Sequence, residues 1–493
     1  MPKIFHTSDE IIVSTKQTSI AVYRGVAAGR LRKLASRLYT TDLHSAPEEI
    51  ISRNLWRIVA GFFPGALIAD RTAIENRPAA DHSVFVVHEK TSALELPGLH
   101  IRPRKGPGPL KNDREFLHGM RIASTARAYL ENLRPSRSRS GAVARTLSKD
   151  ELVLHLDALL RASGEEALNR LRDEAREVAA PLGMIDESRS LDTLIGTLLG
   201  TREAKLGSPL GAAYVAGAPY DSHRMELFET LRQKLAVAAP THYTAKAGDG
   251  IALPFFEAYF SNFIEGTEFA VEEAQEIIFH GKIPAARPQD AHDITGTFDV
   301  VRNQGEMRRI AGAPDEFMGI LCARYARIMA GRPEHSPGRF KADVNRAGSS
   351  VFVHPRHVRG TLGEGFSLHR TLPNPFARAV FMMFLVSEVH PFSDGNGRCA
   401  RIMMNAELVA AGEARIIIPT VFRGEYLQSL KAMTHSGRPD ALISVLNFAW
   451  RYTHQLDFSS LVKARAQLTA THAFEPPAGA FGEGAKLVLP STI

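Results

Sequence analysis

The stretch NPFARAVFMMFLVSEVHPFSDGNGRCARIMMNAELVAA, residues 374–411, joins two apolar segments through a polar loop. Asn374 followed by Pro375 is a strong helix start, because asparagine caps a helix and proline fits its first position. The helix that follows is apolar nearly all round, so we expect it at the buried centre of its domain. A second helix is expected to open near Arg398, after the loop PFSDGNG.

This loop carries more chemistry than a turn requires. A Gly-Asn-Gly turn at a helix N-terminus points backbone N–H groups at one place and lets an anion approach closely. Arg398 and Arg401 are three residues apart and share one helix face above that place. Asp394 is the oxygen ligand that a magnesium-bound nucleotide takes, and His390 is suited to accept a proton near neutral pH. The pattern therefore indicates a site for a di- or triphosphate.

Simpler interpretations exist for each part of the loop. The sequence DGNG is often only a tight turn, and a lone histidine is more often a helix cap than a base. The letters DGNGR also resemble the start of a calcium-binding loop, but the acidic ligand expected downstream is missing. The coincidence of these polar features directly after a buried helix favours a functional site.

The segment HPFSDGNGRCAR, residues 390–401, fits in full the Fic family signature His-x-Phe-x-Asp/Glu-Gly-Asn-Gly-Arg-x-x-Arg. Residues 220–455 resemble a Fic domain as a whole, with IIIPTVFRGEYLQSLKAM after the signature. The resemblance implies an enzyme, a protein adenylyltransferase, which transfers AMP from Mg-ATP to a Ser, Thr or Tyr hydroxyl of a target protein. A lysine replaces Gly397 in the subgroup that transfers phosphate, so this glycine disfavours kinase activity.

The same resemblance assigns roles to the first half of the signature. His390 is implied to be the base that deprotonates the target hydroxyl, which then attacks the α-phosphate. Asp394 is implied to bind the Mg²⁺ that bridges the α- and β-phosphates. Phe392 is expected to pack beneath the loop and hold it in place.

The second half of the signature is expected to bind the nucleotide. The resemblance assigns Gly395, Asn396 and Gly397 to an anion hole that stabilises transition-state charge. Arg398 is implied to act in catalysis by neutralising the departing pyrophosphate. Arg401 is implied to bind the γ-phosphate of ATP.

An upstream helix carries a second motif. In FFEAYFSNFIEGTEF, the residues Ser261, Glu265 and Gly266 resemble the inhibitory motif Ser/Thr-x-x-x-Glu-Gly/Asn of Fic proteins that inhibit themselves. The resemblance implies that Glu265 pairs with Arg401 and occupies the place of the γ-phosphate. The alternative is a solvated glutamate on an amphipathic helix.

A hairpin is expected over 340–353, and RAGSSVFVHP, residues 346–355, corresponds to the "flap" of Fic domains. An exposed hairpin edge can align an extended target segment by adding a strand. We expect Val351 and Phe352 to anchor that segment near the histidine of the signature. The alternative is a surface hairpin without a partner.

The N-terminal region is basic, with 24 Lys and Arg against 14 Asp and Glu in residues 1–150. The segment TSIAVYRGVAAGRLRKLASRLYTTDL resembles the winged helix-turn-helix of abortive-infection-type antitoxin regulators, apart from Arg37, where glycine is usual. This resemblance implies double-stranded DNA as a partner, and the expected contacts are Arg24, Arg30, Arg32 and Lys33. The alternative is a protein-binding winged helix with an ordinary basic surface.

A chain of 493 residues is too long for one core. We predict a mainly α, multidomain fold: a winged helix-turn-helix-like domain (1–70), an α+β middle domain with a helical second half (71–218), an all-helical Fic domain with a β-hairpin flap (219–455) and a tail (456–493). Two cysteines provide neither a disulfide framework nor a cysteine-based zinc site. We expect a cytoplasmic protein without a membrane partner, because no signal peptide or long apolar run is present.

Two other functions fit the same residues. One is a Fic protein whose main reaction removes AMP from a target, with Glu265 positioning the water. The other is a DNA-binding transcriptional regulator that uses nucleotide only as an effector. A homodimer is a further expectation.

Overall fold

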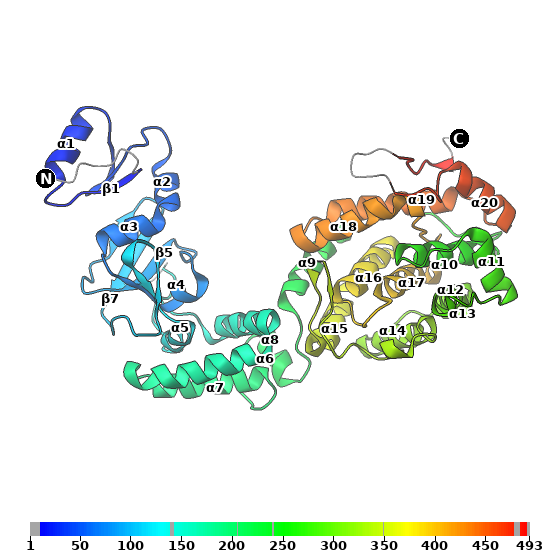
Figure 1. Cartoon of the computed structure of the whole chain (residues 1–493), viewed down its shortest axis with the longest axis horizontal. Helices are drawn as coiled ribbons and strands as arrows, with labels where there is room; N and C mark the ends of the chain where they lie inside the picture. The colour runs from blue at the N-terminus through cyan, green and yellow to red at the C-terminus, as the bar shows by residue number, and fades with distance from the viewer. Residues whose placement is uncertain are drawn as a thin grey trace. The chain divides into compact units, whose positions relative to one another are not determined.

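The computed structural model describes residues 10–138, 142–204, 206–238, 241–348, 350–477 and 484–490. The chain divides into two compact units, residues 1–217 and residues 218–493 (Figure 1). The first combines short strands with helices, and the second is almost entirely helical. The predicted fold class, mainly α and multidomain, is therefore confirmed.

The N-terminal unit contains a three-stranded antiparallel sheet in the order β1-β3-β2 and a mixed six-stranded sheet in the order β6-β7-β5-β4-β9-β8. In the larger sheet β5 pairs with β7 and β4 pairs with β9 in parallel. The strands are β1 (Ile11–Val13), β2 (Arg32–Ala35), β3 (Leu38–Thr40), β4 (Leu67–Ile68), β5 (Ser83–Val87), β6 (Leu94–Leu96), β7 (Leu99–Arg104), β8 (Arg114–Glu115) and β9 (Arg121–Ile122). The helices are α1 (Ser19–Ala27), α2 (Pro47–Arg53), α3 (Leu55–Phe62), α4 (Asp70–Glu75), α5 (Thr125–Asn132), α6 (Lys149–Leu182), α7 (Ile185–Leu198) and α8 (Pro209–Val215).

One hydrophobic core joins the two sheets of this unit. Ile11 and Leu38 of the small sheet belong to the same buried cluster as Val84 and Ile101 of the large sheet. The domain boundary predicted at residue 70 therefore divides a shared core. Arg37 has φ 64°, a left-handed conformation that favours glycine, at the position where the antitoxin resemblance expects glycine.

The C-terminal unit contains twelve helices among its described residues, and α16 and α17 lie side by side in its middle (Figure 1). These helices are α9 (Ser222–Ala236), α10 (Ala252–Ile264), α11 (Val271–His280), α12 (Pro288–Arg302), α13 (Gln304–Met307), α14 (Pro314–Ile328), α15 (Val358–His369), α16 (Pro375–Val389), α17 (Asn396–Ala410), α18 (Arg423–Ser436), α19 (Pro439–Gln455) and α20 (Leu461–Ala470). A hairpin of β10 (Arg346–Ala347) and β11 (Ser350–Val351) lies between α14 and α15 in the sequence, within the range 340–353.

Helix α16 is buried along almost its whole length, as its composition requires. Its N-cap is Asn374, whose side-chain oxygen accepts a hydrogen bond from the backbone N–H of Ala377 at 2.8 Å. Helix α20 lies in the segment predicted to be a tail, but its Ala464 and Leu468 are fully buried in the core of this unit. Across the described residues, no helix is both long enough and apolar enough to cross a membrane.

Candidate functional site

His390 ends helix α16 in a left-handed conformation, with φ 51°. Its Nδ1 lies 3.2 Å from the carbonyl oxygen of Ser387. Because a carbonyl oxygen only accepts, Nδ1 must carry the proton in this contact, and Nε2 is left as the basic nitrogen. Burial of the ring lowers the pKa of His390 to about 4, so the imidazole is neutral at physiological pH.

Aromatic rings hold the loop that follows. Phe392 is fully buried and stacks on Tyr325, with ring centroids 3.7 Å apart and planes within 4°. Phe352 of the flap stacks on the imidazole of His390, with centroids 3.7 Å apart and planes within 6°. Phe392 thus lies beneath the loop, and Phe352 covers the histidine ring from the flap side.

Residues 395–397 form the N-terminus of α17. Gly395 is the N-cap and has φ 68°, which a residue with a side chain rarely adopts. The side chain of Asn396 accepts a hydrogen bond from the N–H of Phe392 and donates one to its carbonyl oxygen, each at 2.9 Å. Asn396 therefore closes the loop through its side chain, and its backbone N–H is part of the N-terminus of α17. Gly397 leaves the helix N-terminus open.

Asp394 is placed at the edge of this loop with its side chain 49% exposed. Nε2 of His335 lies 3.9 Å from Oδ2 of Asp394. Among the described residues there is no cluster of three or more His, Cys, Asp or Glu that could hold a metal ion by itself. A single half-exposed carboxylate fits a Mg²⁺ ion that takes its other ligands from phosphate oxygens and water.

Arg398 is buried and held by other side chains. Its Nη1 lies 2.8 Å from Oδ2 of Asp293 on α12, and its Nη2 lies 3.2 Å from the sulfur of Met329. Arg332 pairs with the same Asp293 oxygen at 2.8 Å. The guanidinium of Arg398 is thus oriented by a carboxylate that the motif does not contain, and Asp293 could not be found from the signature.

Arg401 contacts both polar residues of the upstream motif. Its Nε donates to Oγ of Ser261 at 3.0 Å, and its Nη2 donates to Oε1 of Glu265 at 2.7 Å. Burial opposes the charged form of Arg401, but the Glu265 carboxylate and Tyr426 together outweigh this effect and raise the pKa of the guanidinium. Glu265 follows the last residue of α10, and Gly266 after it has φ 92°, so the chain turns away immediately.

Glu265 also lies directly over the N-terminus of α17. A Cβ atom added to Gly397 would overlap with Oε1 of Glu265 and come within 2.9 Å of its Cδ. The carboxylate thus occupies the space in front of the helix N-terminus, where an anion would bind.

A cavity of about 270 Å³ lies beside His390 and Arg401, whereas Asp394 and Arg398 do not line it. Of the predicted residues it is lined by Glu265, Phe352, His390, Gly397 and Arg401. Val351, with 39% of its surface exposed, does not line it. Helix α18 forms another wall, with the side chains of Tyr426, Leu427, Leu430 and Lys431. The sequence similarity after the signature marked this segment, but not which of its residues face the cavity.

Comparisons with known proteins agree with this geometry. Residues 319–408 match the sequence profile of the Fic/DOC family. This part of the chain is similar to Fic-family domains. The chain is 25% identical over 182 residues to protein adenylyltransferase fic-1 of Caenorhabditis elegans, a match that covers 36% of each protein. It is 38% identical over 216 residues to protein adenylyltransferase Fic of Drosophila erecta, with 43% of each covered.

A solved Fic-domain-containing signalling protein from Bacteroides thetaiotaomicron VPI-5482 aligns with a TM-score of 0.38 and 15% identity, over 50% of this chain and 97% of that one. The chain spans only about a third of the length of the first curated relatives that it matches. The residues that match the Fic/DOC profile lie wholly in the C-terminal unit.

Outside the Fic domain, the predicted DNA contacts lie around the end of α1. Arg24, Arg30 and Lys33 are exposed, whereas Arg32 is partly buried and donates from Nη2 to the carbonyl oxygen of Ser45 at 2.5 Å. Helix α1 also exposes apolar side chains, among them Tyr23 at 75%. This surface is therefore both basic and apolar.

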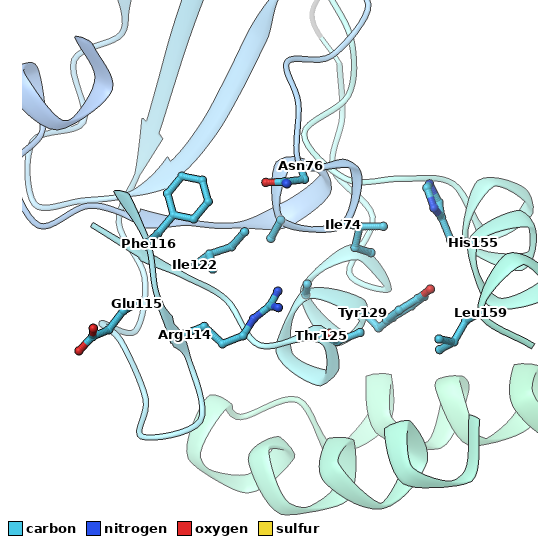
Figure 2. A pocket seen from close by; sticks show the side chains of 12 residues that line it. Ile74, Asn76, Arg114, Glu115, Phe116, Ile122, Thr125, Tyr129, His155 and Leu159 are labelled. Atoms are coloured by element: carbon cyan, nitrogen blue, oxygen red, sulfur yellow. The ribbon is translucent and has the colours of Figure 1, made fainter. Parts of the chain in front are cut away.

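The N-terminal unit has a cavity of its own, of about 360 Å³ (Figure 2). Figure 2 shows Phe116 and Ile122 on one side and Tyr129 and His155 on the other. Burial lowers the pKa of His155 and raises that of Tyr129. None of the residues predicted from the sequence lines this cavity.

Proposed function

We propose that the C-terminal unit is a protein adenylyltransferase that transfers AMP from ATP to a Ser, Thr or Tyr hydroxyl of a target protein. One observation carries this proposal. A single cavity contains a neutral imidazole, a helix N-terminus without a side chain at Gly397 and a buried arginine, which suit the roles of a base, an anion site and a phosphate ligand. The names of the curated relatives support the same reaction.

In the proposed reaction, Nε2 of His390 accepts the proton of the target hydroxyl, whose oxygen attacks the α-phosphorus of ATP and displaces pyrophosphate. Backbone N–H groups of residues 395–397 stabilise the charge that develops on the phosphate. Arg398 and Arg401 contribute positive charge beside the leaving group. Mg²⁺, when bound at Asp394, supplies charge neutralisation and orients the phosphates.

We also propose that Glu265 inhibits this activity. Its carboxylate pairs with Arg401 and lies over Gly397, so it competes with the terminal phosphate for the same cation and the same helix N-terminus. ATP then binds productively only when this pair opens. Removal of AMP from a target is the alternative reaction, with the same carboxylate positioning a water.

The test is incubation with labelled ATP and Mg²⁺. It compares the unmodified protein with Glu265→Gly and with the double variant Glu265→Gly/His390→Ala. We expect Glu265→Gly to label itself or a lysate protein more strongly than the unmodified chain, and Glu265→Gly/His390→Ala to label nothing. If Glu265→Gly labels no protein, the transferase proposal is wrong. If the unmodified protein instead releases AMP from a protein labelled by Glu265→Gly, the alternative reaction is favoured.

For the N-terminal unit we propose double-stranded DNA as a partner, because Arg24, Arg30 and Lys33 are exposed in a net basic region. Phosphate contacts would make the binding constant fall steeply with salt. The measurement is a salt titration of duplex binding, with the triple alanine variant of these residues as control. A salt-independent affinity, or an unchanged affinity of the variant, would refute the proposal.

A further inference from the structure

The flap is attached to the region of His390 by a buried arginine outside the signature. Arg224 lies in the first turn of α9 and is 8% exposed. Its Nη2 donates to the carbonyl oxygen of Val351 in β11 at 2.7 Å. Its Nη1 lies 2.7 Å from Oε1 of Glu388, the residue two before His390. One guanidinium thus joins the flap backbone to the end of α16.

Glu388 is itself held on its other oxygen. Oγ1 of Thr434 on α18 donates to Oε2 of Glu388 at 2.6 Å. Glu388 is 3% exposed, so its carboxylate is stabilised chiefly by these two partners. We call Arg224, Glu388 and Thr434 the flap anchor. The anchor connects α9, α16 and α18 to a single carbonyl of the flap.

The segment that leads into the flap has a second attachment, to the two residues directly after His390. The backbone N–H of Lys341 donates to the carbonyl oxygen of Pro391 at 2.9 Å, and Nδ2 of Asn345 donates to that of Phe392 at 2.8 Å. The N–H of Phe352 in turn donates to the carbonyl oxygen of Asn345 at 3.2 Å. The backbone of Phe352 is therefore held to the second attachment through Asn345, and its ring stacks on the imidazole of the signature histidine.

We propose that Arg224 is a positioning residue of the transfer reaction: through the flap anchor it sets where β11 and Phe352 lie over His390, and so where a target segment presents its hydroxyl to Nε2. This inference rests on the proposed function and adds to it a residue outside the motif. Arg224 acts on the protein substrate, not on the nucleotide, because its contacts are with Val351 and Glu388, and none of the predicted phosphate-binding residues is among them.

The choice of arginine supports this role. A planar guanidinium can hold a carbonyl and a carboxylate at the same time in fixed directions, whereas an ammonium group is a point charge without that geometry. Arg224→Lys therefore keeps a cation opposite Glu388 while losing the fixed contact with the flap carbonyl. Arg224→Gln leaves the buried Glu388 carboxylate without its cation, and Arg224→Gln/Glu388→Gln removes that imbalance.

The first experiment is hydrogen–deuterium exchange of the full chain, which needs no activity. We expect exchange at the Phe352 amide to become about tenfold faster in Arg224→Lys, which corresponds to the loss of one charge-assisted hydrogen bond. Exchange should also become faster in Arg224→Gln/Glu388→Gln. Amides of α16 and α17 should stay protected. The matched control is Arg232→Gln on the same helix, because Arg232 pairs with its neighbour Glu229 at 2.7 Å and, among the described residues, with no flap residue. Unchanged exchange at Phe352 in all Arg224 variants overturns the proposal.

The second experiment uses the Glu265→Gly background. With Arg224→Lys added, we expect protein labelling to slow about tenfold while the Kd for Mg-ATP changes less than about twofold. If the Kd rises by the same factor as labelling falls, Arg224 acts on the nucleotide and the proposal is overturned. If the Glu265→Gly parent labels no protein, the proposed function fails, and the exchange experiment still decides whether the anchor holds the flap.

Discussion

Replacing Glu265 by glycine should strengthen ATP binding, and the gain in binding free energy can be worked out from the ion pair between Glu265 and Arg401. The pair with Arg401 spans 2.7 Å, and the two side chains are 31% and 6% exposed. A hydrogen bond to a charged group contributes about 1.5–3 kcal/mol when buried, whereas an exposed ion pair contributes about 0–1 kcal/mol. Because Glu265 is partly exposed, we take ~1–2 kcal/mol, which corresponds to about a 5- to 30-fold lower Kd for ATP.

The assay is isothermal titration of Mg-ATP into the unmodified protein, Glu265→Gly and Glu265→Gln. Glutamine removes the charge but keeps a hydrogen-bond acceptor, so its Kd should lie between the other two. Glu268→Gly is the control, because Glu268 is an exposed acid three residues further along the chain. Equal affinities of the unmodified protein and Glu265→Gly would refute the argument that the carboxylate competes with the γ-phosphate.

Gly397→Ala should abolish labelling even in the Glu265→Gly background, measured as label incorporated from ATP, because a Cβ there closes the helix N-terminus to phosphate. The labelling rate of Glu265→Gly should stay level from pH 8 to about pH 6 and fall only toward pH 4, since the lowered pKa of His390 keeps its ring neutral; a midpoint near the ordinary histidine value of about 6.5 would contradict this. The same lowered pKa means that neutral His390 contributes to the free energy of unfolding measured in urea. This contribution is complete above about pH 6.5 and declines as the pH falls toward 4. Phe392→Ala should lower the free energy of unfolding by about 3–5 kcal/mol in the same assay, because the ring is fully buried. Asp394→Asn should unfold at nearly the unmodified urea concentration but need more Mg²⁺ for half-maximal labelling, and an unchanged Mg²⁺ requirement would exclude Asp394 as a ligand.

The structure of the loop could be predicted from the sequence because the residues that form it are consecutive. Capping by Asn374 and the glycines around Asn396 act within one helical turn, so local rules predict where α16 begins and where α17 follows the loop. The same rules misjudged longer-range packing. The segment predicted as a tail contains the buried helix α20, and the boundary predicted at residue 70 divides one core. Whether a helix or strand is buried depends on which other elements pack against it, and hydrophobic periodicity alone does not show those partners.

By itself, then, the sequence determined the order of the proposed base, metal ligand, anion hole and arginines, because twelve consecutive residues place those groups around one turn. Tertiary structure alone decided which distant side chains meet them. Glu265 and Arg401 are 136 residues apart, and Arg224 is 127 residues from Val351. Asp293, which pairs with Arg398, lies outside both sequence motifs. Such contacts depend on how the helices pack around α16, which brings distant charges together where neither can be solvated alone.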